Sequence, residues 1–126
     1  MSTSPQTSPD CIFCKIGSGQ IPAPLLHDDA DCVAFRDIHP QAPTHILVIP
    51  RRHVRDLLEL STATADATAE PLLGRLLRVA GDVATAAGLS ADGFRVVINT
   101  GAHGGQSVFH LHLHVLGGRP LGWPPG

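Results

Sequence analysis

The strongest constraint on the fold is the alternation of histidine with apolar residues over residues 110–115. Histidine occupies positions 110, 112 and 114, and leucine or valine occupies positions 111, 113 and 115. Because successive side chains of a β-strand point to opposite faces, this spacing places three imidazoles on one face. An imidazole can act as a nucleophile, a proton donor or acceptor, or a metal ligand near neutral pH. A strand that is merely rich in histidine is the alternative, but three histidines in register favour a functional site.

Length and charge limit the class of protein. The 126 residues suit one compact domain, expected over residues 10–126, and 43% hydrophobic against 16% charged residues indicates a globular chain. Residues 1–9 are rich in Ser, Thr, Pro and Gln, so we expect a disordered tail rather than a secretory signal. A net charge of −2 and the lack of a long apolar run argue against nucleic acid or a membrane as partner. Three cysteines, an odd number, favour a reduced cytoplasmic location over a disulfide scaffold.

The remaining pattern predicts an α+β domain on an antiparallel sheet, because strands are followed by one main helix and then by strands again. We expect strands over residues 25–27, 32–36, 45–49, 94–99 and 108–116. Short helices are expected around residues 11–16 and 54–60, and one long helix over about 69–87. The long helix should bury a face made of Leu72, Leu73, Leu76, Leu77, Ala80, Val83, Ala84 and Ala87.

A glycine-rich loop leads into the histidine segment. It reads Gly101-Ala102-His103-Gly104-Gly105-Gln106-Ser107 and follows Asn99. Glycine lets backbone N–H groups approach an anion closely, and Ser107 and Asn99 supply further neutral donors. A flexible hairpin connection would have the same composition. Beside three histidines, the loop indicates a phosphate held in front of an imidazole.

The central histidine, His112, is the predicted nucleophile. A neutral imidazole can attack phosphorus when one ring nitrogen is free and the other donates a hydrogen bond that fixes the tautomer. A phosphate ester or amidate would then form a phosphohistidine-type intermediate, which water releases. We expect His114 to donate to the phosphate oxygens.

A pair of cysteines, Cys11 and Cys14, has the spacing of a zinc motif. Two thiolates and two imidazoles make a tetrahedral zinc site, and His53 and His110 could supply the nitrogens. A redox pair and two small core residues are the alternatives that the sequence leaves open.

Asp37 follows a predicted strand. A carboxylate at such a position can accept both hydroxyl groups of a ribose. A solvated aspartate in a turn is the alternative reading.

Taken together, these residues resemble the histidine triad (HIT) family, and closely its purine nucleoside phosphoramidase branch. The resemblance covers about residues 11–126. Its motifs are Cys11-Ile12-Phe13-Cys14-Lys15-Ile16, Ile21-Pro22-Ala23, Asp37-Ile38-His39-Pro40-Gln41-Ala42-Pro43-Thr44-His45, Val48-Ile49-Pro50, Gly104-Gly105-Gln106-Ser107-Val108, the three histidines, and Trp123-Pro124-Pro125-Gly126.

The resemblance implies a fold and an activity. The fold would be a five-stranded antiparallel sheet with one long helix and one or two short ones, and a homodimer would join two sheets into a ten-stranded one. The activity would be hydrolysis of purine nucleoside 5′-phosphoramidates, of the AMP-amine or AMP-lysine type, through a nucleotidyl group on His112.

The resemblance also implies roles for individual residues. The carbonyl of His110 would hold the second ring nitrogen of His112, His45 would support the triad, and Ser107 could protonate the leaving group. The nucleotide would be held by Asp37 at the ribose and by a phosphate and base site made of Phe13, Ile16, Phe35, Ile38, Leu47, Asn99, Gly105, Gln106, Ser107, Val108, His112 and His114. Trp123 would approach the partner subunit's site. Zinc, where present, would be structural, on Cys11, Cys14, His53 and His110.

Two other functions remain open from the sequence. A dinucleoside polyphosphate hydrolase or phosphorylase of the same family would cleave phosphoanhydrides faster than P–N bonds. A nucleotide-binding or metal-binding regulatory module would retain binding without turnover.

Overall fold

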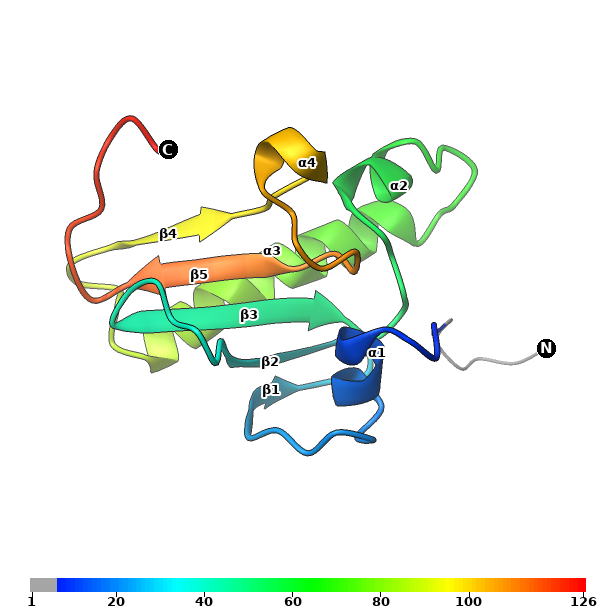
Figure 1. The fold of residues 1–126 in the computed structure, drawn as a ribbon, viewed down its shortest axis with the longest axis horizontal. Coiled ribbons are helices and arrows are strands. Elements are labelled where there is room, and N and C mark those ends of the chain that lie inside the picture. Colours follow the sequence, from blue (N-terminus) through cyan, green and yellow to red (C-terminus); the bar gives the residue numbers. More distant parts are fainter. Residues whose placement is uncertain (1–6) are drawn as a thin grey trace.

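The computed structural model describes residues 7–126 (Figure 1). Five antiparallel strands form one sheet in the order β1-β2-β3-β5-β4. The strands are β1 (Leu25–Asp28), β2 (Cys32–Arg36), β3 (Thr44–Pro50), β4 (Phe94–Val97) and β5 (Leu113–Gly117). The helices are α1 (Ile12–Gly17), α2 (Leu57–Ser61), α3 (Ala69–Ala86) and α4 (Gly101–Gly104). The predicted α+β class, the five-stranded sheet and the single long helix are confirmed.

Both faces of the central strands are buried, so the sheet separates two apolar clusters. On one face α3 covers the sheet (Figure 1), and Ile46 and Val48 of β3 pack in a cluster with Leu76 of α3. On the other face, Leu47 and Ile49 pack in a second cluster with Phe13 of α1. Because residues 46–50 of β3 alternate between two dry faces, this part of the strand is a continuous apolar run.

The buried face of α3 differs from the predicted one at Leu77. This side chain is 53% exposed, whereas Val79, which was not predicted to face the core, is fully buried. Each helical residue turns the chain by about 100°, so Leu77 lies well away from the line through Leu76, Val79 and Val83 that meets the sheet. The predicted face was therefore wider than the surface that the sheet covers.

The histidine strand is shorter than predicted. The sequence predicted a strand over residues 108–116, but β5 begins only at Leu113, so His110 and His112 precede the ladder. The cause is Pro50, the last residue of β3, which has no N–H to donate. Its carbonyl accepts a hydrogen bond from Nε2 of His110 at 2.8 Å. The N–H of Leu111 donates instead to the Val54 carbonyl at 2.6 Å.

Two further differences from the sequence-based predictions concern β4 and the glycine-rich segment, which precede β5 in the chain. The strand predicted over residues 94–99 ends at Val97, which pairs with His114 near the start of β5 and leaves the next residues without a partner strand. The glycine-rich segment, predicted as a loop, contains the one-turn helix α4, which is a third short helix beyond the one or two expected. Gly105 ends α4 in the left-handed conformation, with φ of 83°, which glycine adopts without strain.

The ends of the chain add little regular structure. Residues 1–6 of the predicted tail lie outside the described residues, and Ser8 already contacts Cys14, its N–H lying 3.4 Å from the Sγ atom. The predicted boundary between residues 9 and 10 stays a prediction. Residues 118–126 form no helix or strand, as their prolines predict. Over residues 7–126, no helix combines the length and apolarity needed to cross a membrane.

The substitution Leu76→Ala should test the core beneath α3. Leu76 is fully buried, so truncation should lower the free energy of unfolding by about 3 kcal/mol through lost apolar contact and a residual cavity. Urea denaturation measures this. The matched control is Leu58→Ala in α2, where the side chain is 55% exposed and a change within about 0.5 kcal/mol is expected. Equal losses at both positions would contradict the assignment of the core.

Candidate active site

A cavity of about 770 Å³ lies over the face of the sheet opposite α3. Residues far apart in sequence meet there because α1, the segment before β1, the end of β2 and the start of β5 border the same space. The predicted site residues that line it are Phe13, Ile16, Phe35, Asp37, Ile38, His45, Leu47, Ser107, Val108, His112 and His114. A mainly apolar wall with a few polar groups is typical of a small-molecule site.

His112 lies in this cavity, and one of its two ring nitrogens already makes a hydrogen bond. Its Nδ1 atom lies 2.7 Å from the carbonyl oxygen of His110. A carbonyl oxygen can only accept, so Nδ1 carries the proton and the lone pair is left on Nε2. Phe13 packs edge-on against the ring, with the centroids 5.2 Å apart. The side chain is therefore held in place, and its free nitrogen has the character of a nucleophile.

His114 has the opposite tautomer, which is set through His45. The N–H of Gln41 donates to Nδ1 of His45 at 3.0 Å, so a neutral His45 carries its proton on Nε2. That atom lies 2.8 Å from Nδ1 of His114, which must accept. The remaining proton of His114 is then on Nε2, a buried atom that has no hydrogen-bond partner within residues 7–126. A buried donor without a partner indicates a position where a ligand atom would accept.

Burial keeps these imidazoles neutral. Removal from water lowers the pKa of His114 to about 4, and the nearby His112 and His45 add to this by like-charge repulsion. Burial also lowers the pKa of His112 and of His45, although the carboxylate of Asp37 opposes the shift at both residues. At neutral pH the cavity therefore presents a lone pair on His112 and an N–H on His114 rather than two cations.

His110 is fully buried and turns away from the cavity, toward the cysteine pair. Its Nδ1 atom lies 3.3 Å from Sγ of Cys11 and 3.5 Å from Sγ of Cys14, and Nδ1 of His53 lies 3.3 Å from Sγ of Cys14. The four atoms all lie within 4.8 Å of one another. Tetrahedral zinc with ordinary bond lengths would place sulfur and nitrogen ligands about 3.6 Å apart. Because Nε2 of His110 donates to the Pro50 carbonyl, Nδ1 has the lone pair that a metal requires.

Of the glycine-rich segment, Ser107 lines the cavity, as does Val108, the residue that follows it. Gln106 is buried, and its amide bonds to backbone groups of Gly101, Arg55 and Val108, so it braces the segment rather than facing the cavity. The N–H of Gly105 donates to the Ala102 carbonyl at 3.1 Å. Its predicted contact with a phosphate stays a prediction and would require that N–H to change partner.

Two other predicted nucleotide-binding residues also lie off the cavity wall. Asn99 lies between β4 and α4 in the chain, and Trp123 is 82% exposed in the C-terminal segment. Conversely, sequence analysis missed part of the wall, namely Ile12, Ile21, Pro22, Ala23, Pro24, Leu26, Arg36, His39 and Gln41. The prolines among residues 21–24 favour extended backbone, but a tertiary contact holds this segment at the cavity, since the Ile21 N–H donates to the Lys15 carbonyl of α1 at 3.1 Å.

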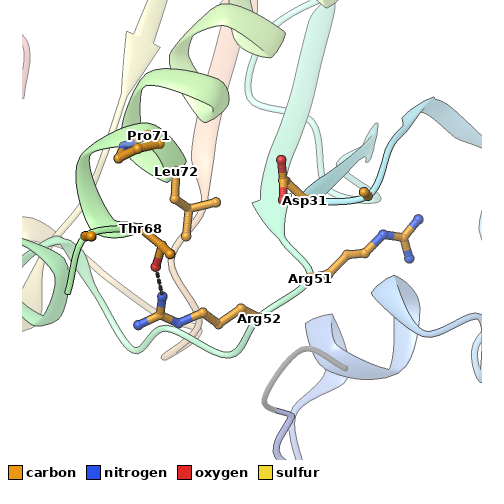
Figure 2. Close-up of a pocket in the computed structure, with 8 residues that line it drawn as sticks. Asp31, Arg51, Arg52, Thr68, Pro71 and Leu72 are labelled. Carbon is orange, nitrogen blue, oxygen red and sulfur yellow. Dashed lines mark hydrogen bonds between the residues drawn. The ribbon is translucent and has the colours of Figure 1, made fainter. Parts of the chain in front are cut away.

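A second, smaller cavity of about 360 Å³ lies beyond the ends of β2 and β3 and beside α3 (Figure 2). Two arginines border it, but they point in different directions. Arg52 donates to Thr68 at 3.1 Å and to Asp66 at 2.8 Å, while Arg51 donates to the Asp29 carbonyl at 2.7 Å. Since these guanidinium groups are already paired and do not converge, the cavity lacks the arrangement of a binding site.

Comparison of the sequence with known proteins identifies the family. The sequence model of the HIT domain matches residues 18–121. An uncharacterized HIT-like protein of Synechococcus elongatus is 54% identical over 119 residues, which cover 94% of this chain and 99% of that protein.

Solved structures give the same result. A HIT family hydrolase from Legionella pneumophila is 47% identical with a TM-score of 0.84, covering 93% of this chain and 100% of that one. A Zn-bound histidine triad family protein from Mycobacterium smegmatis is 37% identical with a TM-score of 0.72, covering 87% of this chain and 76% of that one.

The resemblance found in the sequence is therefore confirmed for the family, while the phosphoramidase branch stays a prediction. The domain match spans most of the chain, and a relative more than half identical covers nearly all of it. On this evidence the chain belongs to the HIT family.

Proposed function

We propose that the chain hydrolyses purine nucleoside 5′-phosphoramidates through a covalent nucleotidyl intermediate on His112. The observation that carries the proposal is the pair of unlike nitrogens in one cavity. Nε2 of His112 has a free lone pair, because Nδ1 donates to the His110 carbonyl. Nε2 of His114 has a proton and no partner within the described residues. A nucleophile beside a neutral donor suits attack on a phosphorus whose oxygens are negatively charged.

The reaction has two steps in this geometry. Nε2 of His112 attacks phosphorus, the N–P bond to histidine forms, and the P–N bond to the amine breaks. Ser107, which lines the cavity, would give the leaving amine its proton. Water then attacks phosphorus and returns a proton to Ser107, the bond to His112 breaks, and the nucleoside monophosphate leaves. Throughout, the N–H of His114 would bind a phosphate oxygen as charge builds on it.

The rest of the cavity fits the nucleoside half. Phe13, Phe35 and Leu47 give an apolar surface on which a purine can lie. One oxygen of Asp37 accepts the His39 N–H at 2.8 Å, and this carboxylate, which lines the cavity, would accept the ribose hydroxyls. Trp123, exposed and outside its own cavity, would reach the partner subunit's cavity in the homodimer that the family resemblance implies and contact the leaving group.

We also propose a structural zinc ion on Cys11, Cys14, His53 and His110. The spacing of the four ligand atoms fits tetrahedral coordination, and the Mycobacterium smegmatis relative is Zn-bound. Four protein ligands would leave no position for a reactive water. The ion would hold α1, which contributes Phe13 to the cavity, against the histidine segment.

The substitution His112→Ala should abolish turnover. Without the ring there is no nucleophile, so kcat on adenosine 5′-phosphoramidate and on an adenosine lysyl-phosphoramidate should fall roughly 10³-fold or more. AMP binding, followed by calorimetry, should persist. The control is His103→Ala, an exposed histidine of α4, which should retain activity. Full activity of His112→Ala would overturn the mechanism, and wild-type turnover confined to phosphoanhydrides would favour a polyphosphate hydrolase.

The pH dependence of kcat should show an acid limb below the usual histidine value. His114 must accept from His45 through Nδ1, and this requires the neutral ring, whose pKa is lowered to about 4. His112 must also be neutral to attack phosphorus, and burial lowers the pKa of its ring too, so the acid limb of kcat should be centred below about pH 6.5. Substrate decay in buffer alone is subtracted. A limb centred at pH 6.5 or above would contradict this.

The zinc proposal is tested by metal analysis of protein purified without added zinc. Wild type should contain about one zinc per chain, and Cys14→Ala should lose most of it because one of four ligands is gone. Cys32→Ala is the control, since this buried thiol lies outside the four-residue group. Protein without stoichiometric zinc in the wild type would count against the site.

A further inference from the structure

The segment that follows β5 holds the loop between β2 and β3 at two adjacent points. Nη2 of Arg119 donates to the Gln41 carbonyl at 3.0 Å. Gly118 lies so close to the loop that a Cβ atom there would be 2.8 Å from Cβ of Pro43, and its φ of 92° also favours glycine. The two segments lie at the same end of the sheet (Figure 1). This contact is called the clasp below.

The loop under the clasp, residues 37–43, carries the groups that set the catalytic histidines. It is closed at its base by the Asp37 N–H, which donates to the His45 carbonyl at 2.9 Å. Its Gln41 is held from both sides, since the carbonyl accepts from Arg119 and the N–H donates to Nδ1 of His45 at 3.0 Å. Arg119 therefore fixes the position of the residue on which the tautomer of His45 depends.

We propose that Arg119 is a positioning residue for the reaction, which keeps His114 as an Nε2–H donor by holding Gln41 against His45. The inference rests on the proposed function for its catalytic consequence. The chain of contacts runs from Arg119 to Gln41, from Gln41 to His45 at 3.0 Å, and from His45 to His114 at 2.8 Å.

The clasp preserves the direction in which each hydrogen bond of this series is donated. If the Gln41 N–H leaves Nδ1, His45 can carry its proton there and present a lone pair at Nε2 to His114. His114 would then donate through Nδ1, and its own Nε2 would present a lone pair to the phosphate oxygens. Such an arrangement is repulsive toward an anion, so one displaced N–H in the loop would convert a donor in the cavity into an acceptor.

The groups facing His45 have opposite effects on the protonation of its ring. The Asp37 carboxylate, 3.5 Å from Nε2, favours a proton on that atom and favours the cationic ring. The neighbouring His112 and His114 rings oppose a second charge. The Gln41 N–H also opposes it, because a protonated Nδ1 would meet another donor. Release of Gln41 should therefore let His45 bind a proton at higher pH.

The experiment compares Arg119→Gln and Arg119→Lys with wild type, and Arg78→Gln, an exposed arginine of α3, is the matched control for loss of charge. With adenosine 5′-phosphoramidate, Arg119→Gln should lower kcat by about tenfold, as expected for loss of one charge-assisted hydrogen bond, with little change in KM. Its acid limb should move to higher pH. Arg119→Lys keeps a cation that can reach the carbonyl and should restore most of kcat, and Arg78→Gln should match wild type.

A second measurement does not depend on the substrate. Ring ¹⁵N NMR should show His45 and His114 as Nε2–H tautomers in wild type and a shift toward Nδ1–H in Arg119→Gln. Unchanged ring signals in Arg119→Gln would overturn the inference, whether or not kcat falls. If wild type fails to hydrolyse phosphoramidates, the proposed function fails, but the ring signals still decide the role of Arg119.

Discussion

The site depends on burial, which keeps adjacent imidazoles neutral, and on the hydrogen bonds that decide which nitrogen of each ring carries the proton. A neutral imidazole has one donor and one acceptor, so a bond at one nitrogen decides the character of the other. The His110 carbonyl does this for His112, and the Gln41 N–H does it for His45 and, through it, for His114. Two buried rings and the half-buried ring of His114 thereby present two different chemical groups to one cavity, and in water neither assignment would be fixed.

The irregular approach to β5 makes this division possible. In a regular ladder the carbonyl of His110 would be directed at a neighbouring strand. Because β3 ends at Pro50, the residues before Leu113 leave the sheet, and the His110 carbonyl is free to accept from the ring two residues later. A proline at the end of β3 thus determines the tautomer of the predicted nucleophile, which lies just before β5.

His110 connects the two chemical sites of the molecule. Its ring lies among Cys11, Cys14 and His53, while its carbonyl holds His112. Its Nε2–H is fixed by the Pro50 carbonyl at 2.8 Å, so hydrogen bonds hold both the ring and the carbonyl of this one residue. In the proposed enzyme, the zinc ion would act at a distance from the chemistry, by fixing the residue that orients the nucleophile.

The sequence by itself determined the fold class, the strands, the long helix and most of the polar residues of the site, because alternation and helical spacing are local properties of the chain. It also predicted the four residues that the structure groups as possible metal ligands, Cys11, Cys14, His53 and His110. Only the tertiary structure decided that the His110 ring lies off the cavity that His112 and His114 line, that Gln106 braces its own segment, and that Leu77 is exposed. It also decided the tautomers, which rest on backbone groups of Gln41 and His110. Every residue has such groups, so residue identity cannot indicate which of them will meet an imidazole once the chain has folded.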